Sequence, residues 1–252
     1  MARAEEPVVP LQSGSTRRTP ATTVAGLCYL AVIAGGLFAE GVARRSLIVP
    51  DDPAATAAAI LGNETLWRLG IAVHLLYLVP GLVMKVIVSG LFRSAEPTLA
   101  RLALVFGVAA VTVEAVALVP LTVPIVVAGN GGAPLTGLAD APALIALATR
   151  LFANGFAFSL LLFAGFCVGV GGLILRSRLL PRAIGAGMIL AGVCYVVNTL
   201  ALIVSPALFA WLNPGILLPI LLAELALALW LLLKGSRSSR LPLRPHRLSP
   251  RE

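Results

Sequence analysis

The sequence has little charge and few aromatic side chains. Only 12% of its 252 residues are charged and 59% are hydrophobic, whereas a soluble domain has about 25% charged and roughly 45–50% apolar residues. This composition excludes an ordinary soluble protein. Aromatic residues make up 6% of the chain, and its apolar runs are continuous rather than alternating, which argues against a membrane β-barrel. The sequence therefore predicts an all-α, polytopic transmembrane helical bundle.

Cysteine and histidine are also scarce. Cys28, Cys167 and Cys194 lie inside apolar segments without CxxC spacing, so we interpret them as small packing residues. His74 and His246 are too few to predict a metal or haem site. Serine-hydrolase, HExxH, P-loop and dinucleotide-binding motifs are absent. We therefore expect no cofactor, and no catalytic residue is assigned.

Six apolar runs are long enough to cross a membrane, since about 20 helical residues span a hydrocarbon core of about 30 Å. Charged, proline-containing or glycine-containing breaks separate them. Tails at 1–20 and 236–252, the second of them basic, are expected to be disordered and cytoplasmic. The domain between them, 21–235, is predicted to contain spans at approximately 22–43, 66–92, 101–127, 150–175, 183–204 and 214–234.

Basic residues predict the orientation, because cytoplasmic loops are enriched in Lys and Arg. With both termini in the cytoplasm, only Arg44, Arg45, Arg68 and Arg150 fall on the outer side. The net charge of +8 then reflects topology, and no nucleic-acid partner is expected. Lys85 is expected to extend toward the inner interface. The basic C-terminal tail is expected to contact anionic lipids of the bilayer.

Two segments carry more specific signals. In the long outer loop, Asp52 is predicted to cap a short helix that begins at Pro53 and stops at Gly62. In the fourth span, Gly165-x-x-x-Gly169 and Gly171-Gly172 are typical of helices that approach their neighbours closely.

Four segments resemble a known family. They are GGLFAEGVARRSLIVPDD (35–52), AATAAAILGNETLWRLG (54–70), LLPRAIGAGMILAG (179–192) and LLPILLAELALALWLLLKG (217–235). The chain resembles the bacterial domain-of-unknown-function family DUF4386. This resemblance implies a compact multi-pass protein of the bacterial inner membrane. It implies no reaction and no catalytic residue.

Polar residues within the spans are the candidate functional residues, because ionisable groups are costly in lipid. Glu40 precedes Arg44 by four residues, and Glu64 precedes Arg68 likewise, which favours ion pairs within one helix. The outer group is interpreted either as interface anchors or as the lining of a ligand cavity. It consists of Glu40, Arg68, Arg150, Asn154 and Asn198.

Three further polar residues are expected deeper in the membrane. Glu114 and Glu224 fall near the middle of the third and sixth spans, and His74 lies about a third of the way into the second. If the third and sixth spans are neighbours, the two carboxylates would lie at similar depth, as in a proton relay or a carboxylate metal site. Alternatively, each glutamate bonds to an adjacent helix and stabilises the bundle.

Three classes of function remain open. We expect a non-enzymatic protein that senses, scaffolds or modulates a partner, which would be tightly packed. A small-solute or proton-coupled transporter would instead place Glu114 or Glu224 on a central cavity. An enzyme acting on a lipid-like substrate would place His74 or Glu40 in a polar cleft, within hydrogen-bond reach of another titratable group.

Overall fold

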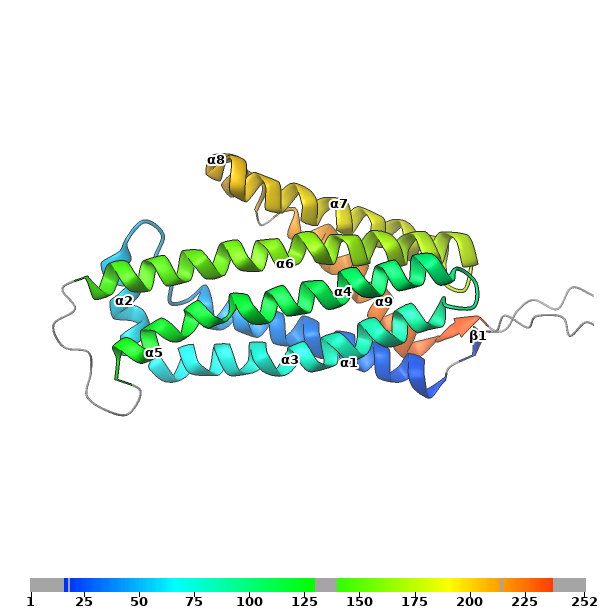
Figure 1. Ribbon diagram of the computed structural model, residues 1–252, viewed down its shortest axis with the longest axis horizontal. Helices are drawn as coiled ribbons and strands as arrows, with labels where there is room; N and C mark the ends of the chain where they lie inside the picture. Colours follow the sequence, from blue (N-terminus) through cyan, green and yellow to red (C-terminus); the bar gives the residue numbers. More distant parts are fainter. Residues whose placement is uncertain (1–15, 18, 130–139, 214, 238–252) are drawn as a thin grey trace, which may run out of the picture.

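The computed structural model describes residues 16–17, 19–129, 140–213 and 215–237, and these form an elongated bundle of helices (Figure 1). Two short strands, β1 (Thr16–Arg17) and β2 (Ser236–Arg237), pair antiparallel. The α-helices are α1 (Pro20–Gly36), α2 (Pro53–Gly62), α3 (Glu64–Leu91), α4 (Pro97–Ala117), α5 (Val123–Val127), α6 (Ala141–Ser177), α7 (Arg182–Val204), α8 (Pro206–Leu212) and α9 (Leu217–Leu233). A π-helix, η1 (Leu37–Arg44), continues α1, and a 3₁₀ turn, η2 (Val119–Thr122), follows α4.

Among the described residues, five helical segments are long and apolar enough to cross a membrane: Pro20–Arg44, Glu64–Leu91, Pro97–Val127, Ala141–Ser177 and Arg182–Val204. The sixth predicted span corresponds to α9, which has 17 residues and is therefore about 26 Å long. Many large apolar side chains are exposed along the bundle, including Leu76, Val105 and Leu222. Such a surface suits lipid rather than water. The fold is that of a multi-pass membrane protein.

The third predicted span is not one regular helix. Pro120 and Pro124 follow the end of α4, and each lacks the backbone N–H that a continuous helix would use. The chain passes through η2 before α5 restores α-helical geometry. The apolar run nevertheless continues from Pro97 to Val127.

Helix α6 is the central packing element, with extensive contacts to both α4 and α7. A Cβ atom at Gly171 would lie only 2.6 Å from the Gly185 carbonyl oxygen of α7, and one at Gly169 would lie 2.9 Å from the Ala103 Cβ of α4. These glycines therefore permit the close approach that the sequence predicted.

Two apolar cores fill the bundle. The first surrounds Tyr29, Met84, Phe166, Met188 and Leu227, where α1, α3, α6, α7 and α9 meet. The second lies toward the end that carries α2 and α5 and includes residues such as Trp67, Tyr77, Leu121, Ile145 and Phe152. The candidate functional site lies in this second core.

The short helix predicted in the 44–65 loop is confirmed. A carboxylate oxygen of Asp52 accepts a hydrogen bond of 2.8 Å from the Ala55 amide, Pro53 is the first helical residue, and Gly62 is the last. Of the two predicted tails, residues 1–15, 18 and 238–252 lie outside the described part of the chain. Within that part, β1 and β2 hold the start of α1 beside the end of α9 (Figure 1).

Candidate functional site

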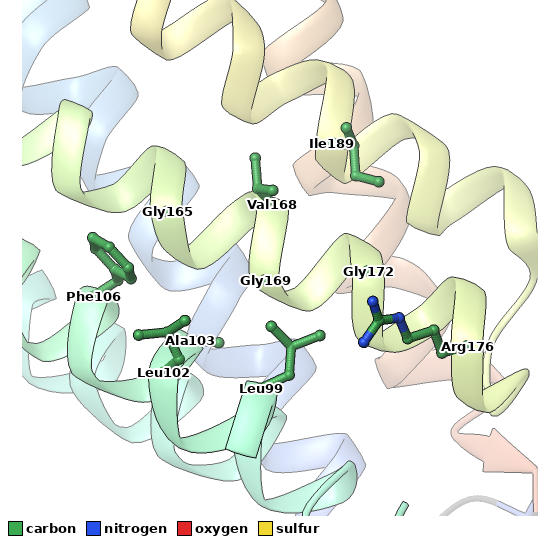
Figure 2. A pocket seen from close by; sticks show the side chains of 10 residues that line it. All are labelled: Leu99, Leu102, Ala103, Phe106, Gly165, Val168, Gly169, Gly172, Arg176 and Ile189. Carbon is green, nitrogen blue, oxygen red and sulfur yellow. The ribbon is translucent and has the colours of Figure 1, made fainter. Parts of the chain in front are cut away.

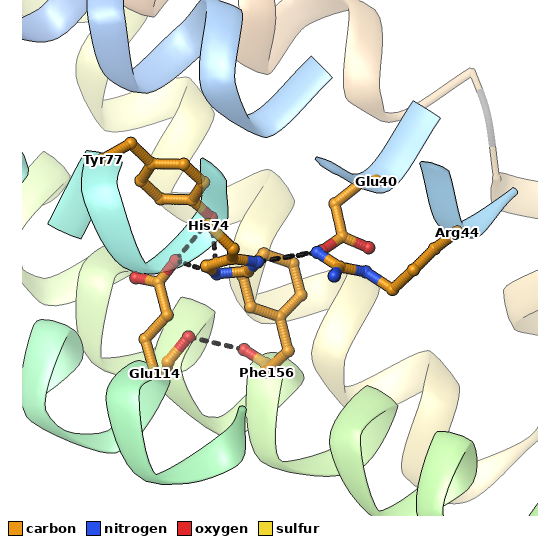
Figure 3. Close-up of polar contacts among 7 residues, drawn as sticks. Glu40, Arg44, His74, Tyr77, Glu114 and Phe156 are labelled. Atoms are coloured by element: carbon orange, nitrogen blue, oxygen red, sulfur yellow. Dashed lines mark hydrogen bonds and ion pairs between the residues drawn. The ribbon is translucent and has the colours of Figure 1, made fainter. Parts of the chain in front are cut away.

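A cluster of five polar side chains occupies the second core. Glu40 and Arg44 come from η1, His74 and Tyr77 from α3, and Glu114 from α4. Figure 3 shows His74 between the η1 pair on one side and Glu114 on the other. His74 is fully buried and Arg44 is 3% exposed. Burying ionisable groups is costly unless they are paired and hydrogen-bonded, so the contacts within this cluster determine its stability.

The π-helical geometry of η1 positions Glu40 and Arg44. The Arg45 amide donates to the Glu40 carbonyl oxygen at 3.1 Å, a bond that spans five residues instead of four. Arg44 and Glu40 form an ion pair on this wide turn. Gly70 of α3 packs against Ala43, where an added Cβ atom would lie 2.7 Å from the Ala43 side chain. This close approach allows Arg44 to reach His74, one helical turn beyond Gly70.

The contact between Arg44 and His74 determines the protonation state of the imidazole. An Arg44 terminal nitrogen lies 2.6 Å from His74 Nδ1. A guanidinium group has donors only, so Nδ1 has to accept and carries no proton. His74 is therefore the neutral tautomer with its hydrogen on Nε2.

The other face of His74 contacts Tyr77 and Glu114. His74 Nε2 lies 2.6 Å from the Tyr77 hydroxyl oxygen and 3.0 Å from Glu114 Oε1. The Tyr77 hydroxyl in turn donates to Glu114 Oε1 at 2.8 Å. With hydrogen on Nε2, His74 donates toward both oxygens. A continuous hydrogen-bonded chain thus connects the Arg44 guanidinium with the Glu114 carboxylate.

Aromatic rings enclose the cluster. The Arg44 guanidinium carbon lies 4.5 Å from the centre of the Phe152 ring, and the His74 ring stacks on Tyr77 at 4.5 Å. The rings of Phe152 and Phe156 of α6 are nearly perpendicular to the His74 ring, so both form T-shaped contacts with it. Among the described residues, the buried Nε and Nη1 atoms of Arg44 have no hydrogen-bond partner. The guanidinium is therefore held by one nitrogen and by its ring contact, and it retains unused donors.

The model of a family described as a domain of unknown function, DUF4386, matches residues 24–235. The chain belongs to the DUF4386 family. This agrees with the resemblance seen in the sequence. No curated protein and no solved structure matches the chain.

The other candidate residues of this DUF4386 protein lie elsewhere. Arg68 pairs with Glu64 at the surface. Arg150 and Asn154 are exposed on α6, and Arg150 lines a cavity of about 230 Å³ beside the start of α2. Asn198 is buried on α7, where its side-chain oxygen has no hydrogen-bond partner within the described ranges.

Glu224 belongs to a separate polar group. It is 8% exposed and accepts a hydrogen bond of 2.7 Å from the Tyr195 hydroxyl of α7. Helix α9 packs on α1 and α7, whereas α4 packs on α3 and α6. Glu114 and Glu224 therefore have different partners. In the described part of the chain, no group of three or more His, Cys, Asp or Glu residues is arranged to hold a metal ion.

The expectation that Lys85 extends to the membrane interface is wrong. Lys85 is 5% exposed, and its ammonium nitrogen lies 4.8 Å from the centre of the Phe163 ring. Gly107 of α4 makes room for the lysine stem, because a Cβ atom there would lie 2.9 Å from Lys85 Cδ. The lysine thus turns into the bundle and gains a cation–π contact.

Sequence reasoning identified His74, Glu40 and Glu114 but assigned them to different depths, and it omitted Tyr77. A signal for Tyr77 was present in the sequence, because it follows His74 by three residues and so lies on the same helical face. The partnership of Arg44 with His74 had no such signal, since it depends on how η1 packs against α3.

Proposed function

We propose that this DUF4386 protein is a non-enzymatic membrane sensor whose conformation responds to protonation of His74. The observation that carries this proposal is the 2.6 Å contact between Arg44 and His74 Nδ1. The contact exists only while Nδ1 is unprotonated, because an imidazolium and a guanidinium both donate and both carry positive charge. Histidine is the side chain that most readily changes charge between pH 5 and pH 8.

The groups around His74 indicate what protonation would change. Glu40 Oε1 of η1 lies 3.5 Å from Nδ1 and could accept its new proton in a hydrogen bond. Tyr77 and Glu114 already occupy the Nε2 side. From α6, only the uncharged rings of Phe152 and Phe156 face the imidazole. Protonation would therefore redirect Glu40 toward His74 and displace Arg44.

The surrounding structure offers a route by which this displacement could spread. Arg44 ends a π-helix, and short π-helical segments are frequent at functional sites. Its guanidinium also packs against Phe152 of α6, the central helix of the bundle. A shift of Arg44 would thus alter the contact between η1 and α6. Conversion between two such packings is a common form of molecular switch.

A six-span topology with both ends in the cytoplasm of a bacterial cell is part of the proposal. The start of α1 packs against the end of α9, since a Cβ atom at Gly26 would lie 2.7 Å from the Leu232 amide nitrogen. Antiparallel pairing of β1 with β2 also favours chain ends on one side. Both contacts require the two chain ends to lie on the same side of the membrane, and an even number of spans places them there. The basic tail predicted at 236–252 would then meet the anionic inner leaflet.

A proton-coupled transporter is the second candidate, favoured by the polar group around Glu224. Glu224, Tyr195 and Lys85 place titratable side chains in the first core as well. Against this candidate, cavities of about 350 and 230 Å³ in the described part of the chain are lined by neither Glu114 nor Glu224. The hydrogen bonds of His74 also meet one expectation for an enzyme, but neither cavity reaches His74.

Trp67 provides a built-in reporter for the proposed sensor. It is 1% exposed in the same core as His74, and its indole donates to the Leu121 carbonyl oxygen at 2.9 Å. In a background with Trp211→Phe and Trp230→Phe, the full chain would be reconstituted in lipid nanodiscs. Trp67 fluorescence and deuterium uptake of the 37–47 segment, corrected for intrinsic exchange, would be followed from pH 5 to 8.

We expect one reversible transition in both measurements. His74→Gln should abolish it, because glutamine cannot become cationic. The matched control Glu224→Gln removes a buried acid from the other polar group and should preserve the transition. No change in either measurement for the unsubstituted background, or an unchanged transition in His74→Gln, would refute the sensor.

A further inference from the structure

An apolar groove lies between α4 and α6, away from the His74 cluster. Its volume is about 350 Å³. Figure 2 shows its lining: Leu99, Leu102 and Phe106 stand on α4, Gly165 and Gly169 form its floor on α6, and Arg176 lies at one end. Of the ten described lining residues, only Arg176 is charged. The groove therefore has an apolar length and a single basic end.

The dimensions of the groove match one leaflet of a bilayer. Gly165 and Arg176 are eleven residues apart on one α-helix, which corresponds to about 16 Å at 1.5 Å per residue. Half of a hydrocarbon core is about 15 Å thick. If Arg176 lies at the membrane interface, the Gly165 end of the groove lies near the midplane.

The charge at this end of the bundle matches an anionic head group. Arg176 is exposed in the last turn of α6. Arg93 follows α3, Arg178 follows α6, and Arg182 begins α7, so further cations surround the same end. Basic pockets between transmembrane helices bind anionic lipid head groups.

We propose that this groove binds one acyl chain of an anionic phospholipid, whose phosphate contacts Arg176. The chain of the lipid would lie beside Gly172 of α6, where a Cβ atom would meet nothing nearer than a Leu99 methyl carbon at 3.6 Å. The guanidinium offers paired donors that match phosphate oxygens. This site is independent of the proposed proton response, because the groove shares no lining residue with the His74 cluster.

Gly172 gives a direct way to fill the groove. A Cβ atom there would meet its nearest neighbour, a Leu99 methyl carbon, at 3.6 Å, which is ordinary contact. Gly172→Leu should therefore fold and occupy the groove. Leu102→Trp, at a half-exposed position of α4, fills it from the opposite wall. Gly90→Leu is the matched control, because a Cβ atom at Gly90 meets nothing within 4 Å.

The test uses the delipidated full chain in detergent, titrated with dioleoyl phosphatidylglycerol or dioleoyl phosphatidylcholine and followed by native mass spectrometry. The unsubstituted chain should bind phosphatidylglycerol more tightly. Arg176→Gln should weaken that binding about fivefold, as expected for one arginine at a membrane surface, and leave phosphatidylcholine unchanged. Arg93→Gln is the control for charge alone. Gly172→Leu and Leu102→Trp should weaken binding of both lipids.

Three results would overturn the proposal. Equal phosphatidylglycerol affinity in the unsubstituted chain and in both groove-filling variants would exclude the groove as the site. An equal loss in Arg93→Gln and Arg176→Gln would show general surface attraction instead. A dimer of the chain that is lost in Gly172→Leu, with lipid binding unchanged, would assign the groove to a second copy of the protein.

Discussion

At the scale of single residues, the Tyr77 hydroxyl is the group that joins His74 to Glu114. It lies 2.6 Å from His74 Nε2 and donates to Glu114 at 2.8 Å. Tyr77→Phe keeps the stacked ring but leaves Glu114 with one donor fewer. We expect a loss of about 0.6 to 1.7 kcal/mol in the free energy of unfolding, the range found for side-chain hydrogen bonds in membrane helices. Unfolding in mixed micelles with increasing sodium dodecyl sulfate measures it.

A suitable control lies on α4. The Thr112 hydroxyl is exposed and donates only within its own helix, to the Val108 carbonyl oxygen. Thr112→Val should therefore change the free energy of unfolding by less than about 0.5 kcal/mol. If Tyr77→Phe were as mild as this control, the hydroxyl would have no structural role in the cluster.

At the scale of elements, the wide π-helical turn of η1 determines where Arg44 lies. Deleting Gly41 would shorten η1 by one residue and reduce the Glu40–Arg44 spacing from four residues to three, so that Arg44 would lose its present register relative to Glu40 and His74. Arg44 would then leave His74 and Glu40, and the free energy of unfolding should fall by less than the about 3–5 kcal/mol of a fully buried charge pair, because the Glu40 side chain is 34% exposed. The deletion should also abolish the pH transition of Trp67. Unfolding in mixed micelles and fluorescence report the two effects.

Gly41→Ala separates the π-helical register from the identity of the residue. A Cβ atom at Gly41 meets nothing within 4 Å, so the substitution keeps every contact of η1. Alanine is favoured over glycine in helices by about 0.5–1 kcal/mol. This variant should retain the transition and unfold no more easily than the parent. A deletion variant that behaved in the same way would show that the wide turn has no function.

Two adjacent glycines of α6 provide a test of helix packing. A Cβ atom at Gly171 would lie 2.6 Å from a backbone oxygen of α7, whereas one at Gly172 has 3.6 Å of space. Gly171→Ala should therefore destabilise the bundle by about 1–3 kcal/mol, because α7 has to move outward. Gly172→Ala should be neutral or stabilising. Thermal unfolding in detergent compares the pair, and equal melting temperatures would contradict the close packing of α6 and α7.

At the scale of the whole molecule, apolar runs and caps predict the elements, but they do not predict neighbours. The helices and the Asp52 cap follow from local signals, namely run length, proline and glycine positions, and a capping carboxylate. The cluster of His74, Arg44 and Glu114 joins three elements that are distant in sequence. Its formation depends on the close packing of Gly70 against Ala43 and on the π-helical geometry of η1, which no hydropathy pattern encodes.

The number of membrane spans and the sides on which the chain ends lie depend on the packing of the whole bundle. The α1–α9 contact at Gly26 and the β1–β2 pair place the start of α1 beside the end of α9. If α9 crosses the membrane, the number of spans is six. If α9 does not cross, five spans remain and the chain ends lie on opposite sides. The 17 residues of α9, of which only Glu224 is charged, reach about 26 Å, which matches a slightly thin bilayer.

Fusions to green fluorescent protein and alkaline phosphatase distinguish these arrangements. Green fluorescent protein is fluorescent only in the cytoplasm, and alkaline phosphatase is active only outside it. The two fusions at one position should therefore give opposite results. We expect fluorescent fusions at Met1 and after Glu252, and an active phosphatase fusion after Gly137, between the third and fourth spans. A fusion after Glu252 that is active as phosphatase and dark as a fluorescent protein would place the C-terminus outside. Together with a fluorescent fusion at Met1, this result would show that α9 does not cross, because an odd number of spans would then separate the two ends.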